Sequence, residues 1–285
     1  MIGTKKAGPG RPILRYHGGK WMLAPWIISH FPEHRTYVEP FGGAGSVLLQ
    51  KPRTYSEVYN DLDGEIVNLF RVVRDNGAAL IEKLSMTPFA REEFKLSYKP
   101  AEDPLEQARR TVVRSFMGFG SAAASGAATG FRANSSRSGT TPAHDWAHFP
   151  AEMLAIIERL RGVVIEHRDG AEAILQHDAE DTLHYVDPPY PFSTRRIGNP
   201  YCKKGYRHEM ADAQHEQLAE ILHGLRGMVV VSGYRCDLYD RLFAGWRMHE
   251  RIAHADGARR RTEVLWISPN TPVLNLELWE RRHGQ

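Results

Sequence analysis

The chain has 285 residues, and its hydrophobic and charged fractions of 42% and 25% are typical of a globular protein with an ordinary core. No apolar run reaches the roughly 18 residues that a membrane-spanning helix needs, and the first dozen residues lack the apolar segment of a signal peptide. These features argue against an integral membrane protein, and we expect a cytoplasmic one. The formal net charge of +3 is too small to indicate a nucleic-acid partner by itself.

The two cysteines, Cys202 and Cys236, lack the spacing of a metal site or of a disulfide framework. We therefore predict free thiols and no metal centre. Their scarcity also argues against a covalent mechanism, which would need an activated thiolate.

The N-terminal part of the chain changes from a polar tail to an amphipathic pattern. Residues 1–12 are rich in Gly, Pro and Lys and are predicted to be disordered. Apolar residues in 21–31 recur at helical spacing, which predicts an amphipathic helix that ends near Pro32.

The first strand-like segment, residues 36–40, runs directly into the glycine-rich loop 41–46, and a helical run follows. Glycines in such a turn let the backbone approach a nucleotide-type cofactor and start the helix tightly. A second strand ends at Asp61, about twenty residues further on, where a carboxylate is expected to bind ribose hydroxyls. The glycine loop alone is weak evidence, since nicotinamide-dependent oxidoreductases share it. Residues 65–74 then read as a helix that packs on the sheet.

The strand pattern lapses from 76 to 161, where helical stretches at 104–117 and 151–160 bracket the irregular segment 118–149. Loops this long inside a compact enzyme are usually functional or disordered. We predict four parts: a disordered tail at 1–12, a catalytic domain at 13–75 and 162–270, an inserted subdomain at 76–161 and a C-terminal tail at 271–285.

Strand signals return after the insertion, with a crossover helix at 211–225 among them. The expected strands are 163–166, 182–186, 228–232, 246–252 and 262–267. Strands that alternate with helices form a parallel sheet covered by helices on both faces. The sequence therefore predicts an α/β fold, an open doubly wound sheet with one antiparallel strand.

The strand at 182–186 ends in Asp187-Pro188-Pro189-Tyr190. The carboxylate and the carbonyl of Pro188 can accept hydrogen bonds from an exocyclic amino group, which leaves the nitrogen lone pair more nucleophilic. The ring of Tyr190 can stack on the base that carries this amine. Taken alone, the segment is as typical of a proline-stiffened turn after a core strand as it is of a catalytic motif. Its occurrence in the same chain as a glycine loop favours alkyl transfer to an aromatic amine.

Together these two motifs resemble those of the Dam-like (D12 class) adenine-specific DNA N6-methyltransferases, which use S-adenosylmethionine, and the resemblance covers nearly the whole chain. The family's Trp-x-Gly-Gly-Lys segment is matched by Tyr16-His17-Gly18-Gly19-Lys20, with tyrosine in place of tryptophan. The resemblance implies a Rossmann-like methyltransferase fold, a mainly helical target-recognition insertion, and methyl transfer to the N6 amine of a flipped adenine.

The resemblance also assigns roles to individual residues. The catalytic motif would be Asp187, Pro188, Pro189 and Tyr190, and the cofactor contacts would be Tyr16, Lys20, Glu39, Pro40, Phe41, Gly42, Gly43, Gly45, Asp61, Asp169 and Asp187. Glu39 would face the methionine amino group of the cofactor and Asp169 its adenine amine. An equally good interpretation of Asp169 is a simple helix cap.

DNA contacts are expected from two regions. In the insertion, the resemblance suggests Phe131, Arg132, Asn134 and Arg137. After the catalytic motif, Arg195, Arg196, Lys203 and Lys204 are candidate phosphate contacts, as is the run 259–261. Each basic cluster is also typical of a solvated loop. We expect double-stranded DNA as the partner of a monomer, with a cognate restriction endonuclease as a further candidate partner.

Two alternatives stay open at this point. The carboxylate and the aromatic ring do not distinguish the adenine N6 amine from the cytosine N4 amine. A DNA-binding protein of the same fold that has lost catalysis is a rival from another class, although the intact motifs argue against it.

Overall fold

The computed structural model describes residues 8–120, 128–134, 139–194, 206–255 and 259–273. The remaining residues lie outside the described part of the chain, together with the side chains of 253–255, 259 and 260. The two tail predictions fall largely on these residues and are not tested.

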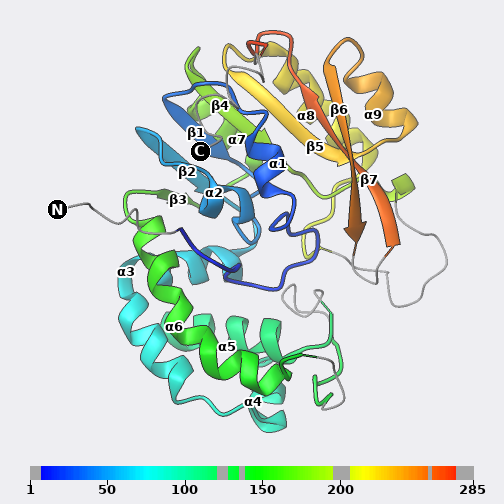
Figure 1. Ribbon diagram of the computed structural model, residues 1–285. Coiled ribbons are helices and arrows are strands. Elements are labelled where there is room, and N and C mark those ends of the chain that lie inside the picture. The colour runs from blue at the N-terminus through cyan, green and yellow to red at the C-terminus, as the bar shows by residue number, and fades with distance from the viewer. Residues whose placement is uncertain (1–7, 121–127, 135–138, 195–205, 256–258, 274–285) are drawn as a thin grey trace.

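A seven-stranded sheet in the order β3-β2-β1-β4-β5-β7-β6 forms the centre of the molecule (Figure 1). Its strands are β1 (Thr36–Glu39), β2 (Ser56–Asn60), β3 (Val164–Glu166), β4 (Thr182–Val186), β5 (Met228–Tyr234), β6 (Arg247–Ala255) and β7 (Arg259–Ile267). Strands β1 to β5 pair in parallel, and β7 runs antiparallel to both β5 and β6. This is an open, doubly wound α/β sheet, and the predicted sheet with one antiparallel strand is confirmed.

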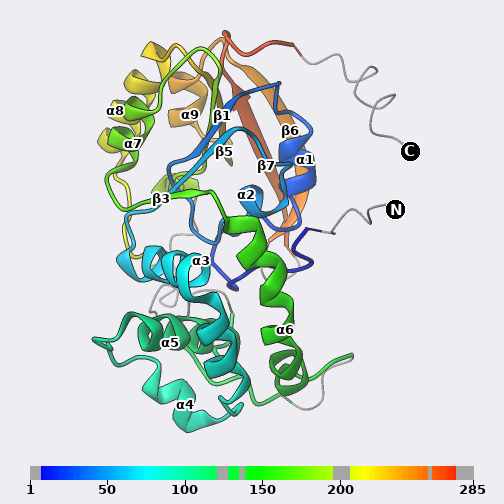
Figure 2. The same cartoon turned by 90° about the vertical axis from the view of Figure 1, so that its left-hand side faces the viewer.

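Helices cover both faces of the sheet, with α7, α8 and α9 on one face and α1 and α2 on the other (Figure 2). The helices are α1 (Ala24–Ile28), α2 (Ser46–Gln50), α3 (Gly64–Ser85), α4 (Arg91–Leu96), α5 (Pro104–Met117), α6 (Pro142–Leu160), α7 (Gly170–Gln176), α8 (Asp212–Gly224) and α9 (Asp237–Leu242), with a short 3₁₀ turn at Phe192–Thr194. No helix in the described part of the chain is both long and apolar enough to cross a membrane.

Successive side chains of the central strands point to opposite faces of the sheet, so the hydrophobic core consists of two clusters, one on each face. In β5, Met228 and Val230 face the cluster that contains α1 and α2, whereas Val229 and Val231 face the cluster under α8 and α9. All five residues of β4 are buried because both of its faces are covered. The buried strands are therefore nearly continuous apolar runs, which is why the sequence predicted them well.

Helices α3 to α6 form a separate group at one end of the molecule, away from the centre of the sheet (Figures 1 and 2). Helix α3 continues well past the predicted end at residue 74, and its backbone leaves helical geometry at Asn76 (φ −138°, ψ 33°) before the helix resumes. Residue 76 is where the inserted subdomain was predicted to start. The domain boundaries themselves stay a prediction.

Two further helix boundaries were predicted wrongly. Residues 142–149, assigned to the irregular segment, form the first half of α6, because Thr141 caps the His144 amide at 3.3 Å and Pro142 occupies the first turn. Pro150 inside this helix hid its continuity from the sequence. The helix expected over 21–31 is only α1, flanked by turns.

The order of strands brings the carboxyl ends of β1 and β4 together. The chain runs outward from β1 to β2 and β3 and then returns to β4 on the other side of β1. Open α/β sheets bind their ligands at such a reversal, beyond the carboxyl ends of the strands. Glu39 at the end of β1 and Asp187 just after β4 therefore meet at the same edge.

Candidate active site

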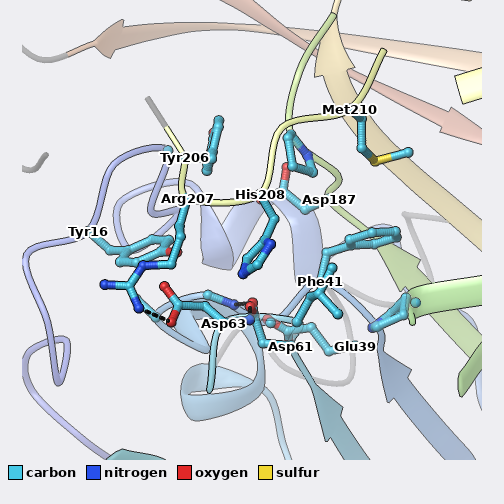
Figure 3. Close-up of a pocket in the computed structure, with 18 of the residues that line it drawn as sticks. Tyr16, Glu39, Phe41, Asp61, Asp63, Asp187, Tyr206, Arg207, His208 and Met210 are labelled. Carbon is cyan, nitrogen blue, oxygen red and sulfur yellow. Dashed lines mark hydrogen bonds and ion pairs between the residues drawn. The ribbon is translucent and has the colours of Figure 1, made fainter. Parts of the chain in front are cut away.

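A cavity of about 240 Å³ opens at the carboxyl ends of β1, β2 and β4 (Figure 3). Its wall contains the predicted cofactor residues Tyr16, Lys20, Glu39, Pro40, Phe41, Gly42, Gly43, Asp61, Asp169 and Asp187. Gly45 does not line the cavity. Of the predicted catalytic motif, Asp187 and Pro189 line the cavity, whereas Pro188 and Tyr190 do not.

The glycine loop between β1 and α2 is closely packed from behind. A Cβ on Gly42 would lie 2.2 Å from an atom of the Tyr59 ring, so a side chain there would displace the loop. Gly43 and Gly45 adopt positive φ angles of 49° and 60°, which other residues rarely accept. A Cβ on Gly45 would also approach Phe70 to 2.9 Å, so Gly45 serves the loop's packing and not the cavity wall.

Two aspartates hold the loop and the start of α3. Asp61 accepts hydrogen bonds from the Gly43 amide at 2.7 Å and from the Asp63 amide at 2.8 Å. Asp63 Oδ1 accepts from the Glu65 amide at 3.0 Å and so caps α3. Among the described residues nothing donates to Asp63 Oδ2, although this atom is buried and Asp63 lines the cavity. A ligand hydroxyl would satisfy it.

Residues 206–210 form the opposite part of the cavity wall, and Figure 3 shows the side chain of Arg207 pointing toward Asp63. The guanidinium lies 3.1 Å from Asp63 Oδ1 and 3.0 Å from Glu65 Oε1. The other oxygen of Glu65 pairs with Arg114 of α5. These ion pairs therefore connect the cavity wall to the helical group.

Glu39 is a buried carboxyl group at the inner end of the cavity. Its Oε2 accepts from the Tyr37 hydroxyl at 2.7 Å and from the Leu48 amide at 3.0 Å. Burial raises the pKa of Glu39 to about 8, and the hydrogen bonds only partly oppose this. A cationic group placed in the cavity would stabilise the ionised form of Glu39.

Asp187 is held on both of its oxygens. The Ser232 hydroxyl donates to Oδ1 at 2.8 Å, and the ammonium of Lys20 lies 3.1 Å from Oδ2. Because Ser232 uses its only proton on Asp187, the Tyr185 hydroxyl, 3.0 Å away, must donate to Ser232. Each carboxylate oxygen keeps a further lone pair, so Asp187 can still accept a hydrogen bond from a substrate amine.

Tyr190 is buried, with 5% of its surface exposed, and its ring is fixed from several sides. Its hydroxyl donates to Glu263 of β7. The ring of Tyr234 meets it edge to face with centroids 4.7 Å apart, and the Lys20 ammonium lies 4.7 Å from its centroid. The aromatic ring is therefore held in one orientation beside Asp187.

Comparison with known proteins identifies this arrangement. A family model described as "D12 class N6 adenine-specific DNA methyltransferase" matches residues 16–256. The chain belongs to this family. The methyltransferase therefore acts on the N6 amine of adenine in DNA at specific sites, which decides between the two amines that physical reasoning left open.

Known relatives are similar in sequence to this chain over most of their length. A DNA adenine methylase from Vibrio cholerae is 25% identical over 93% of this chain and 98% of the relative. A type II methyltransferase from Lactococcus lactis subsp. cremoris is 26% identical over 87% of this chain and 90% of its own. A DNA adenine methylase from Escherichia coli is 24% identical, with 75% and 76% covered.

Two predicted cofactor residues of the methyltransferase have additional contacts. Lys20 lines the cavity, but its ammonium lies between Asp187 and Glu263, next to the catalytic motif. Burial would lower the pKa of Lys20, but the two carboxylates outweigh this and raise it, so the ammonium stays charged. Asp169 caps α7 by accepting from the Ala171 amide at 2.8 Å and also lines the cavity, so the two interpretations of this residue are compatible.

The predicted DNA-binding residues of the insertion lie after α5. The Phe131 ring packs against Phe89 and Phe94 at centroid distances of 5.1 and 5.8 Å, and Arg132 donates to the Phe116 carbonyl at 3.0 Å. Asn134 is exposed. DNA contact by these three residues stays a prediction. The other candidates, Arg137, Arg195, Arg196, Lys203 and Lys204, lie outside the described residues.

The basic run at 259–261 lies at the start of β7. The side chain of Arg261 is directed to the active-site edge, with its guanidinium 4.9 Å from the centroid of the Tyr234 ring and 3.4 Å from the Thr194 carbonyl. The side chains of Arg259 and Arg260 are not among those described. A phosphate contact by this run remains a prediction.

Sequence reasoning missed Ser232, Glu263 and Arg207. Glu263 carried a signal, because it is an isolated acid at the start of the apolar run 264–267 on a core strand. Ser232 carried a weaker one, a polar residue near the carboxyl end of the strand beside β4. Nothing in the sequence around Arg207 indicated that it would reach Asp63.

Proposed function

We propose that this DNA adenine methyltransferase takes its methyl group from S-adenosylmethionine bound in the cavity, and that Asp187 and Tyr190 present the flipped adenine to it. The observation that carries the proposal is the position of Asp187, which lies on the wall of the same cavity as the glycine loop and Glu39. The family implies a methyl donor, and the residues present fit this one.

The fit rests on complementary groups. S-adenosylmethionine has an ammonium group, which the buried carboxyl group of Glu39 suits, and ribose hydroxyls, which suit the acceptors of Asp61 and of the unpartnered Asp63 Oδ2. Phe41 and Leu218 supply apolar surface for its base, and Asp169 an acceptor for the base's amine. When bound, this cofactor supplies an electrophilic methyl group on a sulfonium.

The chain's own residues prepare the nucleophile. Asp187 Oδ2 and the Pro188 carbonyl accept the hydrogens of the N6 amine, so its lone pair is directed at the methyl group. Tyr190 supports the base through its ring, whose orientation the bond to Glu263 fixes. Positioning and electrostatic alignment supply most of the rate.

DNA binding is assigned to the edge around the catalytic motif and to the helical insertion. Arg261, beside Tyr234, and the basic residues at 195, 196, 203 and 204 are the proposed phosphate contacts. The proposed contacts of the insertion are Phe131, Arg132, Asn134 and Arg137. The adenine must leave the duplex to reach the cavity. We further propose that the enzyme acts as a monomer, and that a cognate restriction endonuclease is a partner to search for beside its gene.

Replacing Asp187 tests the mechanism. Asp187→Asn keeps the shape but removes the charge, and we expect transfer of a tritiated methyl group to DNA to fall at least about a hundredfold. Calorimetry should give an S-adenosylmethionine affinity close to that of the wild type. Asp240→Asn is a matched control, because Asp240 is exposed on α9 and pairs only with Arg235 among the described residues. Turnover of the Asp187 variant at the control's rate would contradict the mechanism.

A further inference from the structure

Glu263 is the most unexpected charged group near the active site. It lies on β7, opposite Tyr234 of β5, and only 2% of its surface is exposed. The four residues after it are apolar and buried. Burying a carboxylate so deeply is costly unless it is paired, so a hydrophobic residue would serve a purely structural role better.

One carboxylate oxygen of Glu263 contacts both Tyr190 and Lys20. Oε1 accepts the hydroxyl hydrogen of Tyr190, and the Lys20 ammonium lies 3.6 Å from the same atom. Lys20 is also held by the Gly18 carbonyl at 2.8 Å and by Asp187 at 3.1 Å. Its ammonium is therefore shared between the catalytic carboxylate and Glu263.

This sharing has a consequence for Asp187. Without a second carboxylate, the buried ammonium would have Asp187 as its only anionic partner among the described residues, and it would compete with the target amine for Oδ2. With Glu263 present, the ammonium can move toward Oε1 when a base enters. Glu263 thus acts on both groups that surround the amine position, the ring of Tyr190 and the charge of Lys20.

We propose that Glu263 is a positioning residue for methyl transfer, which holds the Tyr190 ring and draws the Lys20 ammonium away from Asp187 when the target base is bound. This inference rests on the proposed function of Asp187 and Tyr190. It assigns Glu263 to turnover of the bound base and not to cofactor binding.

Two variants separate the charge from the hydrogen bond. Glu263→Gln keeps an acceptor oxygen for the Tyr190 hydroxyl but no charge for Lys20, and Glu263→Leu loses both. The assay is single-turnover methyl transfer to a duplex that contains the site methylated by the wild type, with the S-adenosylmethionine affinity measured by calorimetry. Glu250→Gln is the control, because it removes the same charge from an exposed position on β6.

The Gln variant should transfer methyl groups at least about tenfold more slowly, since misplacing a reacting group by about 1 Å can cost up to about a hundredfold. Its cofactor affinity should stay within about twofold of the wild type, and Glu250→Gln should change neither quantity. A Gln variant as fast as the control, or one whose loss of rate matches a loss of cofactor affinity, would overturn the proposal.

Coupling to Tyr190 gives a second test, which a merely structural glutamate would not pass. If Glu263 acts through the Tyr190 hydroxyl, adding Tyr190→Phe to Glu263→Leu should slow transfer little further, whereas independent effects would multiply. Multiplying effects would overturn the role in holding Tyr190. The Gln variant alone carries the test if Glu263→Leu does not fold. A wild type that methylates no DNA would instead refute the proposed function, on which this inference depends.

Discussion

At the scale of single residues, the active site depends on a short chain of hydroxyl groups. Tyr185 donates to Ser232 and Ser232 donates to Asp187, so the carboxylate is fixed from inside the protein while Lys20 contacts its other oxygen. Both hydroxyl groups are buried. In the proposed mechanism, this arrangement orients the acceptor before substrate arrives, which lowers the cost of reaching the transition state.

Replacing Ser232 tests this orientation. A hydrogen bond to a charged group contributes about 1.5–3 kcal/mol, so Ser232→Ala should slow methyl transfer about ten- to a hundredfold. S-adenosylmethionine binding should be nearly unchanged by calorimetry. Ser85→Ala on the exposed side of α3 is the control. Equal rates for the two variants would show that Ser232 does not orient Asp187.

The raised pKa of Glu39 predicts a pH dependence of stability. Folding moves this pKa from 4.5 to about 8, so the folded state binds the proton more tightly than the unfolded chain does. The contribution of Glu39 to the free energy of unfolding is therefore fully present below pH 4.5 and is lost as the pH rises to about 8. Glu39→Gln should lose less stability over this range than the cofactor-free wild type, in urea unfolding at a series of pH values. Parallel profiles would contradict the assignment.

The strand-end part of the cavity wall was predictable from the sequence, because Glu39, Asp61 and Asp187 lie at the carboxyl ends of three strand signals and parallel strands place such ends together. The part formed by residues 206–210 was not predicted. Ser232 and Glu263 were missed since their importance comes from lying beside Asp187 and Tyr190. That proximity depends on the order β4-β5-β7, which local patterns do not specify.

At the scale of elements, the segment 206–210 completes the cavity that the strand ends begin. Met210 packs against the apolar cluster under α8 and α9, and the ring of Tyr206 meets that of His17 edge to face. Arg207 pairs with Asp63, the N-cap of α3, and with Glu65 in the first turn of that helix, and Glu65 in turn pairs with Arg114 of α5. The cavity wall is thereby linked to the helical group through one arginine.

Removing Arg207 should loosen this wall. Because its side chain is about one-third exposed, we discount the ion pairs for solvent screening and expect Arg207→Ala to weaken S-adenosylmethionine binding about three- to tenfold. Calorimetry measures this directly. Arg226→Ala removes an exposed arginine that pairs with Glu180 and serves as the control. Variants with the same affinity would rule out the anchoring role.

Element boundaries were harder to predict than element types. The strands and the crossover helix α8 agree with the sequence, because buried runs and amphipathic periods are strong signals. The predicted helix at 151–160 covers only the second half of α6, because a proline at position 150 predicts a helix break. The predicted end of α3 lies close to the kink at Asn76. Tertiary packing holds the helical residues after each break, since Leu80 beyond the Asn76 kink and Met153 beyond Pro150 are fully buried.

At the scale of the whole molecule, the chain combines a central sheet that builds the cavity with a helical group at one end (Figure 2). The sequence indicated the insertion as a lapse of strand pattern, but the position of α3 to α6 relative to the sheet depends on long-range contacts such as that between Arg114 and Glu65. The family match over residues 16–256 includes both parts. Under the proposed function, the helical group contacts the DNA target and the part around the sheet modifies it.

The most direct test of this account is to express the protein in cells that lack adenine methylation and to map modified bases across the genome by single-molecule sequencing. We predict N6-methyladenine confined to one short sequence motif, and its disappearance when Asp187→Asn is expressed to the same level. N4-methylcytosine, or an unmodified genome in cells that contain the folded, cofactor-binding wild type, would contradict the account.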